Sequence, residues 1–125
     1  MQKYVLIALG GALGSIARYW IGSTISGRMG IRFPCGTLVV NLTACAVIGF
    51  TLTWLGHRME IGAAWRFFFP VGFIGAYSTF STFEWETLAT LRSGTWALAA
   101  LYVAVSVVLG PCGHVSGALP AEAVS

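Results

Sequence analysis

The side chains best suited to chemistry in this 125-residue chain are hydroxyls, one amide and two phenylalanines, and all of them lie inside long apolar stretches. Between residues 72 and 86 the chain reads GFIGAYSTFSTFEWE. This segment places hydroxyls and aromatic rings in succession: Ser78, Thr79, Phe80, Ser81, Thr82 and Phe83. A hydroxyl donates hydrogen bonds, and the electropositive edge of a phenylalanine ring can face an anion without offering it a proton. The segment therefore suits contact with a small anion.

The same segment is a poor helix former. Glycine, β-branched and hydroxylated residues weaken a helix, so we expect a break near Gly75–Thr79. Carbonyl groups freed at membrane depth must be satisfied by protein, water or an ion, and channels and transporters coordinate ions at such breaks. The alternative is a continuous helix that is rich in glycine and serine.

Two further apolar stretches carry polar stripes at a four-residue spacing. The stripes are Thr37, Asn41, Cys45 and Gly49 in one stretch, and Tyr102, Ser106 and Gly110 in the other. The amide of Asn41 offers two donors, to an anion or to a neighbouring helix. A hydrogen bond between helices is the ordinary role of a membrane asparagine, but the stripes together predict a narrow polar track.

The first apolar stretch combines a glycine face with a cation. Gly10, Gly14, Arg18 and Gly22 share this face. Small residues at this spacing let helices approach closely, which explains the glycines as a packing seam. A buried cation is costly without a partner or water, so Arg18 either has a functional role or extends to the membrane surface.

The composition predicts a membrane protein. Hydrophobic residues make up 57% of the chain and charged residues 9%, against about 25% charged residues in soluble domains. The net charge of +3 comes from basic side chains that are scattered singly, so nucleic acid is not an expected partner. The three cysteines lack metal-ligand spacing and are read as small apolar residues.

The length fits four membrane-spanning helices in one domain over residues 1–125, because each span needs about 20 residues. We place the spans at about 4–26, 35–55, 65–90 and 96–115, and expect the tail GALPAEAVS to be frayed. A signal peptide is the alternative interpretation of the first apolar run. The predicted fold is an all-α membrane protein with four transmembrane helices, the third broken near its middle.

The basic residues that flank the spans give no preferred orientation. Three lie on each side of the membrane: Lys3, Arg58 and Arg66 on one, and Arg28, Arg32 and Arg92 on the other. Without a charge bias, the chain can insert in both orientations and pair as an antiparallel dimer. The alternative is that misplaced span boundaries hide a real bias.

At these residues the chain closely resembles the CrcB/Fluc family of small bacterial fluoride channels. The matching segments are GGALGSIARYW (10–20), FPCGTLVVNL (33–42), IGF (48–50), GFIGAYSTFSTFEWET (72–87) and LYVAVSVVLG (101–110). The resemblance implies an antiparallel, dual-topology homodimer with two pores lined by both subunits. It also implies a channel rather than an enzyme, which passively exports fluoride across the bacterial inner membrane and so limits fluoride toxicity.

The resemblance also implies roles for individual residues. Fluoride pore residues would be Asn41, Phe80 and Phe83, with Ser81 and Thr82 beside the two rings. Tyr102 and Ser106 would supply the polar track on the fourth helix, and Thr37 would lie near a pore end. Arg18 would contribute positive potential to the vestibule. The backbone carbonyls of Gly75 and Ser78 would hold a structural sodium ion (Na+) at the dimer centre.

Some positions depart from the family pattern. Ser78 stands where threonine is usual, and Ala76 and Tyr77 replace smaller or apolar residues beside the break. Ala44 replaces a usual glycine, and Gly110 lacks the hydroxyl that some relatives carry there. Pro111 is expected to kink or end the fourth helix.

Two other functions remain as alternatives. A small dual-topology, proton-coupled multidrug antiporter needs a glutamate in the first helix, whereas this chain has Arg18 there and no acidic residue before Glu60. Glu84 and Glu86 fall near a span end, where we expect them to be solvated or hydrogen-bonded. A non-transporting membrane assembly subunit would need only the glycine seams.

Overall fold

The computed structural model describes residues 1–30, 33–57 and 62–124, and every regular element in these ranges is helical. The elements are α1 (Gln2–Met29), α2 (Cys35–His57), α3 (Ala63–Arg66), η1 (Phe67–Ile74), α4 (Gly75–Tyr77), α5 (Phe80–Arg92) and α6 (Trp96–Val124). Three of the described helices, α1, α2 and α6, are long and apolar enough to cross a membrane. The predictions of an all-α fold and of a multi-pass membrane protein are confirmed.

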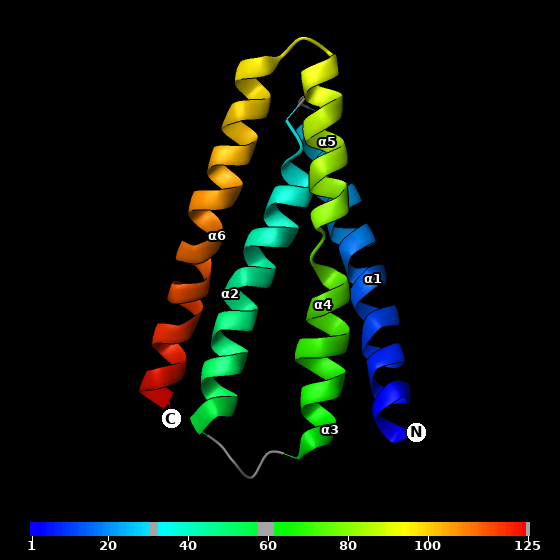
Figure 1. Ribbon diagram of the computed structural model, residues 1–125, viewed down its shortest axis with the longest axis vertical. Helices are drawn as coiled ribbons and strands as arrows, with labels where there is room; N and C mark the ends of the chain where they lie inside the picture. Colours follow the sequence, from blue (N-terminus) through cyan, green and yellow to red (C-terminus); the bar gives the residue numbers. More distant parts are fainter. Residues whose placement is uncertain (31–32, 58–61, 125) are drawn as a thin grey trace.

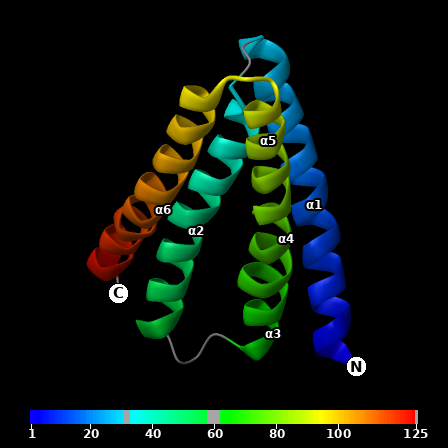
Figure 2. The ribbon, with the colours of Figure 1, turned by 45° about the horizontal axis from the view of Figure 1, so that its top comes forward.

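The helices form an up-and-down arrangement in which both termini lie at the same end (Figure 1). Helix α6 lies beside α2, while α3, η1, α4 and α5 stack end to end as a fourth limb beside α1 (Figures 1 and 2). This limb covers the segment in which the sequence placed the third span.

Glycines bring α1 against η1. A Cβ added at Gly10 would overlap the carbonyl of Phe68, and one at Gly14 would overlap the carbonyl of Phe73. From the other side, a Cβ at Gly72 would come within 2.8 Å of the Ile7 carbonyl oxygen. The packing seam predicted from the glycine face of the first helix is confirmed.

Helix α6 is longer than the sequence suggested. It continues through Pro111 and Pro120 to Val124, past the expected span end near residue 115, and the prediction of a frayed tail is wrong. A Cβ at Gly117 would overlap the Ala46 carbonyl, and one at Gly49 would overlap the carbonyl of His114. This close packing on α2 holds the end of α6 in place, while both proline rings lie on exposed positions.

A ladder of aromatic rings runs along α3, η1 and α4. Trp65, Phe69, Phe73 and Tyr77 stack at successive centroid distances of 5.0, 5.4 and 5.9 Å, with interplanar angles of 12° or less. The Tyr77 hydroxyl ends the ladder 2.9 Å from Thr43 Oγ1 on α2. Tyr77, one of the residues expected to depart from the family pattern, therefore adds a contact between α4 and α2 beside the extended segment.

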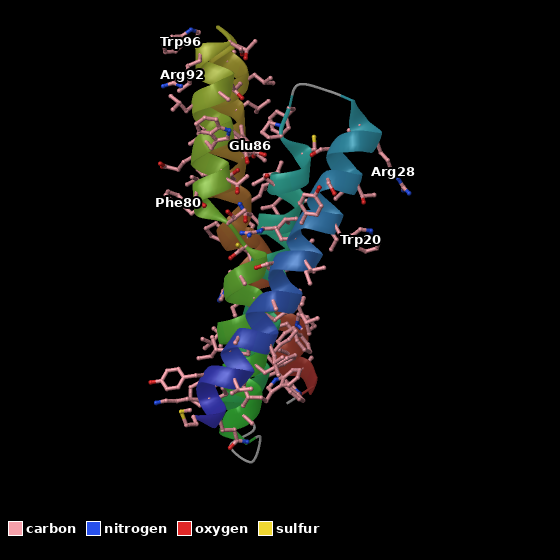
Figure 3. All side chains as sticks on the ribbon, turned by 90° about the vertical axis from the view of Figure 1, so that its right-hand side faces the viewer. Trp20, Arg28, Phe80, Glu86, Arg92 and Trp96 are labelled. Carbon is pink, nitrogen blue, oxygen red and sulfur yellow. The ribbon has the colours of Figure 1, made fainter. Side chains whose placement is uncertain are left out.

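The flanking charges that the structure describes are balanced. Lys3 and Arg66 lie in elements at one end of the molecule, and Arg28 and Arg92 lie toward the other (Figures 1 and 3). The remaining flanking residues of the prediction, Arg32 and Arg58, are outside the described residues, as is Glu60.

Candidate functional site

The site is built around two extended residues between α4 and α5. Ser78 has φ −73° and ψ 156°, and Thr79 has φ −149° and ψ 117°, so neither continues the helix. Thr79 is the N-cap of α5, and its Oγ1 accepts a hydrogen bond of 3.2 Å from the Thr82 N–H. A threonine in this position satisfies one of the unpaired amides at a helix start.

Asn41 clamps this extended segment to α2. Its Oδ1 accepts a hydrogen bond from the Thr79 N–H at 2.8 Å, and its Nδ2 donates to the Thr79 carbonyl at 3.0 Å. Thr79 is only 8% exposed, so its backbone groups need protein partners. The amide of Asn41 supplies both partners, and one of its two N–H donors remains available.

The Asn41 clamp and the Thr79 cap each take a hydrogen-bond donor away from one carbonyl of the limb. In a continuous helix the Thr79 N–H would donate to the Gly75 carbonyl and the Thr82 N–H to the Ser78 carbonyl. These two N–H groups donate instead to Asn41 Oδ1 and Thr79 Oγ1. Carbonyls of unwound helices at membrane depth bind sodium ions, so the backbone oxygens present here fit the ion that the resemblance implies.

A cavity of about 270 Å³ opens beside the clamp, between α2, α5 and α6. We call it the α2–α5–α6 cavity, and its lining is Asn41, Cys45, Ser78, Thr79, Phe80, Phe83, Ser106 and Val107. The rings of Phe80 and Phe83 lie 5.7 Å apart. Among the hydrogen bonds of the described residues none involves the Ser106 hydroxyl, so this group is available to a ligand. Four residues assigned to the pore, namely Asn41, Phe80, Phe83 and Ser106, are thus brought together.

Glu86 joins two other predicted residues to each other. Thr37 Oγ1 donates to its Oε1 at 2.8 Å, and the Tyr102 hydroxyl donates to its Oε2 at 2.9 Å. The Tyr102 ring is fully buried, 5.0 Å from the Phe83 ring. From the sequence, Glu86 was expected to be solvated or hydrogen-bonded near the end of a span, without a role in the site. Its position one turn after Phe83 on the same helix face was the signal that could have identified it.

A second cavity of about 390 Å³ lies between α1, α2 and α5. This α1–α2–α5 cavity is lined by Arg18, Tyr19, Gly22, Ser23, Ser26, Thr37, Val40, Thr79, Thr82 and Glu86. Within the described part of the chain no ion pair joins Arg18 to Glu86. In Figure 3, Phe80 and Glu86 lie on opposite sides of α5, with Glu86 on the side of α1 and α2. Thr79 lines both cavities, so the two lie next to each other at this residue.

Not every predicted pore residue faces the same space. Thr37 and Thr82 line the α1–α2–α5 cavity rather than the α2–α5–α6 cavity. Ser81 lines neither of them: it lies on the outer face of α5 in a cavity with Glu84 and Trp85. Ser81 follows Phe80 directly, and adjacent helical residues point about 100° apart. Its side chain is therefore turned away from the α2–α5–α6 cavity that Phe80 lines.

The sequence model of the family described as CrcB-like protein, Camphor Resistance (CrcB), matches residues 5–118. The chain belongs to the CrcB family. A relative from Acidobacterium capsulatum is 52% identical over 109 residues, which cover 87% of both chains. Another from Solibacter usitatus is 49% identical over 121 residues, which cover 97% of this chain and 99% of the relative.

A third CrcB relative, from Rhodospirillum rubrum, is 44% identical over 131 residues, with 98% of this chain and all of the relative covered. All three relatives carry the name fluoride-specific ion channel FluC. The range matched by the family model, residues 5–118, includes every residue that lines the two cavities.

Proposed function

We propose that the protein is a fluoride-selective ion channel, not an enzyme, that passively exports fluoride from the cytoplasm across the bacterial inner membrane. The observation that carries the proposal is the α2–α5–α6 cavity, in which the free donors of Asn41 and Ser106 meet the rings of Phe80 and Phe83. The relatives named fluoride-specific ion channel FluC support the choice of ion.

The chemistry of this cavity suits a small, strongly hydrated anion. A pore must replace the water shell of the ion with donors while binding weakly enough to release it. The second N–H of Asn41 and the Ser106 hydroxyl are neutral donors, and phenylalanine ring edges add weak positive potential. The clamp on Thr79 fixes the Asn41 amide, so that its free N–H is directed before an ion arrives.

The α1–α2–α5 cavity supplies the approach to this pore. Arg18 attracts anions into it, since a charge in a low-dielectric cleft raises the local concentration of counter-ions. The negative charge of Glu86 opposes this effect, but each of its carboxylate oxygens accepts a hydroxyl hydrogen bond. These bonds to Thr37 and Tyr102 stabilise the carboxylate and hold α5 between α2 and α6.

The working form that we propose is an antiparallel, dual-topology homodimer with two pores lined by both subunits. The balance of Lys3 and Arg66 against Arg28 and Arg92 supports insertion in both orientations. Phe80 is 72% exposed in one chain, and Gly75 is also exposed. A second copy that covers this face would complete the wall of the pore. Labelling a tag at either terminus, in intact cells and again after permeabilisation, tests this proposal. Dual insertion requires that each tag is labelled only in part in intact cells and fully after permeabilisation, and all-or-none labelling in intact cells would refute it.

At the centre of this dimer, the carbonyls of Gly75 and Ser78 from both copies would hold one sodium ion. The bound ion would supply a fixed positive charge that ties the two extended segments together. The proposal is tested by measuring the thermal stability of the purified dimer in sodium and in N-methylglucamine. We expect the midpoint to rise with sodium, and equal midpoints would contradict the site.

Transport is tested with purified protein in liposomes that contain potassium fluoride or potassium chloride. Valinomycin releases potassium and makes anion efflux visible to ion-selective electrodes. We expect rapid fluoride efflux and no chloride efflux above that of protein-free liposomes. Chloride efflux of similar size would contradict the selectivity, and absence of both would favour a non-transporting role.

A further inference from the structure

The polar face of α6 is interrupted at Gly110. Tyr102 binds Glu86 and Ser106 faces the α2–α5–α6 cavity, but the next residue at the same spacing has no side chain. An anion that moves along this face from Ser106 would therefore find no donor from α6 at the level of Gly110.

Helix α2 places a thiol at this level. The Sγ of Cys45 lies 3.7 Å from the position that a Cβ on Gly110 would occupy, and the Cβ of Cys45 lies 3.6 Å from the corresponding position on Gly113. Cys45 also lines the α2–α5–α6 cavity, one turn after Asn41. Its side chain thus lies where α6 offers only backbone.

We propose that Cys45 is a third donor of the fluoride path, after Asn41 and Ser106, and that its S–H group takes the place of a side chain missing at Gly110. This inference rests on the proposed fluoride channel function. A thiol is a weak, uncharged donor, and weak binding at successive positions lets an ion leave as well as enter. The two other cysteines, Cys35 and Cys112, do not line this cavity, and all three are free.

A purely structural role for Cys45, filling space beside two glycines, makes a different prediction from a donor role. The two roles can be distinguished by adding a side chain to α6 at Gly110, next to the Cys45 thiol. A Cβ at Gly110 makes an ordinary contact with Cys45, so a serine or an alanine fits there without a clash. Gly110→Ser places a hydroxyl next to the Cys45 thiol, whereas Gly110→Ala adds nearly the same volume without a donor.

The experiment measures fluoride efflux from liposomes for Cys45→Ala alone and combined with Gly110→Ser or Gly110→Ala. Loss of one hydrogen bond is expected to slow efflux roughly threefold to tenfold in Cys45→Ala. The combination with Gly110→Ser should restore most of the rate, and the combination with Gly110→Ala should not. The exposed Cys112→Ala serves as the matched cysteine control, with an unchanged rate expected.

Equal recovery by Gly110→Ala and Gly110→Ser would assign a packing role to Cys45 and overturn the inference, as would an unchanged rate in Cys45→Ala. Elution of each variant at the volume of the unmodified protein excludes misfolding, and Cys45→Ser, which keeps a donor, should stay within about twofold of it. If the unmodified protein passes no fluoride, the proposed function fails. If it passes fluoride but the rescue pattern is absent, only the role of Cys45 fails.

Discussion

Asn41→Asp is the substitution that most directly tests where the anion passes. The change keeps an oxygen to accept the Thr79 N–H, which lies 2.8 Å from Oδ1. It replaces the donor Nδ2, 3.0 Å from the Thr79 carbonyl, by a second oxygen. The carbonyl of a residue that is 8% exposed then loses its partner, at a cost of about 1–3 kcal/mol. The α2–α5–α6 cavity also acquires a negative charge.

The charge is the larger effect on transport. Two unit charges about 4 Å apart interact with about 4 kcal/mol at an effective dielectric constant of about 20. Each 1.4 kcal/mol changes a rate about tenfold, so a carboxylate at this position should slow fluoride passage about a thousandfold. Asn41→Ala is the matched neutral variant, since it loses the same donor and both bonds to Thr79 but brings no charge.

The assay is fluoride efflux from liposomes, with each variant first shown to elute as the same oligomer. We expect Asn41→Ala to be slowed about tenfold by the lost donor, and Asn41→Asp to fall below detection. A folded Asn41→Asp protein whose rate is within tenfold of the alanine variant would refute the placement of the anion beside Asn41.

Three further substitutions test the packing around the site. Gly14→Ala should destabilise the protein by about 1–3 kcal/mol, because its Cβ would overlap the Phe73 carbonyl. The matched control is Gly27→Ala, whose Cβ would have nothing within 4 Å and which should leave the thermal melt unchanged. Tyr77→Phe keeps the ring stack but loses the hydrogen bond to Thr43 Oγ1, at a cost of about 1 kcal/mol. Combining it with Thr43→Val in a double-mutant cycle should give less than additive loss, and strict additivity would show that this bond contributes nothing. Tyr102→Phe leaves Oε2 of Glu86 without its hydroxyl donor, so the unfolding midpoint and the fluoride efflux rate should both fall. An unchanged midpoint would show that this hydrogen bond does not stabilise the fold.

The sequence was informative where one helix is enough to explain a feature. The glycine face of α1 predicted its close approach to another helix, and the four-residue stripes pointed to Asn41 and Ser106, which line one cavity. Weak helix formers between Gly75 and Thr79 pointed to the segment in which two residues are extended. Each of these features follows from local propensity or helical spacing.

The sequence was less informative where two distant segments decide the outcome. Nothing local to Asn41 says that its amide binds the backbone of Thr79, 38 positions away. The role of Glu86 depends on hydroxyls from two other helices. The length of α6 was underestimated because packing on α2 outweighs the effect of Pro111, an effect that is visible only in three dimensions.

The two residues of the clamp contribute to it through different groups. Thr79 takes part in the clamp through its backbone N–H and C=O, which every residue except proline provides. Asn41 takes part through a side chain that offers an acceptor and a donor next to each other, and glutamine, the other amide, is one methylene longer. In a library randomised at both positions, we therefore expect position 41 to accept almost no other residue. The clamp itself does not restrict position 79, which is limited by its buried N-cap role to small capping residues. The extended segment in one limb of the fold thus depends on a single side chain of another helix.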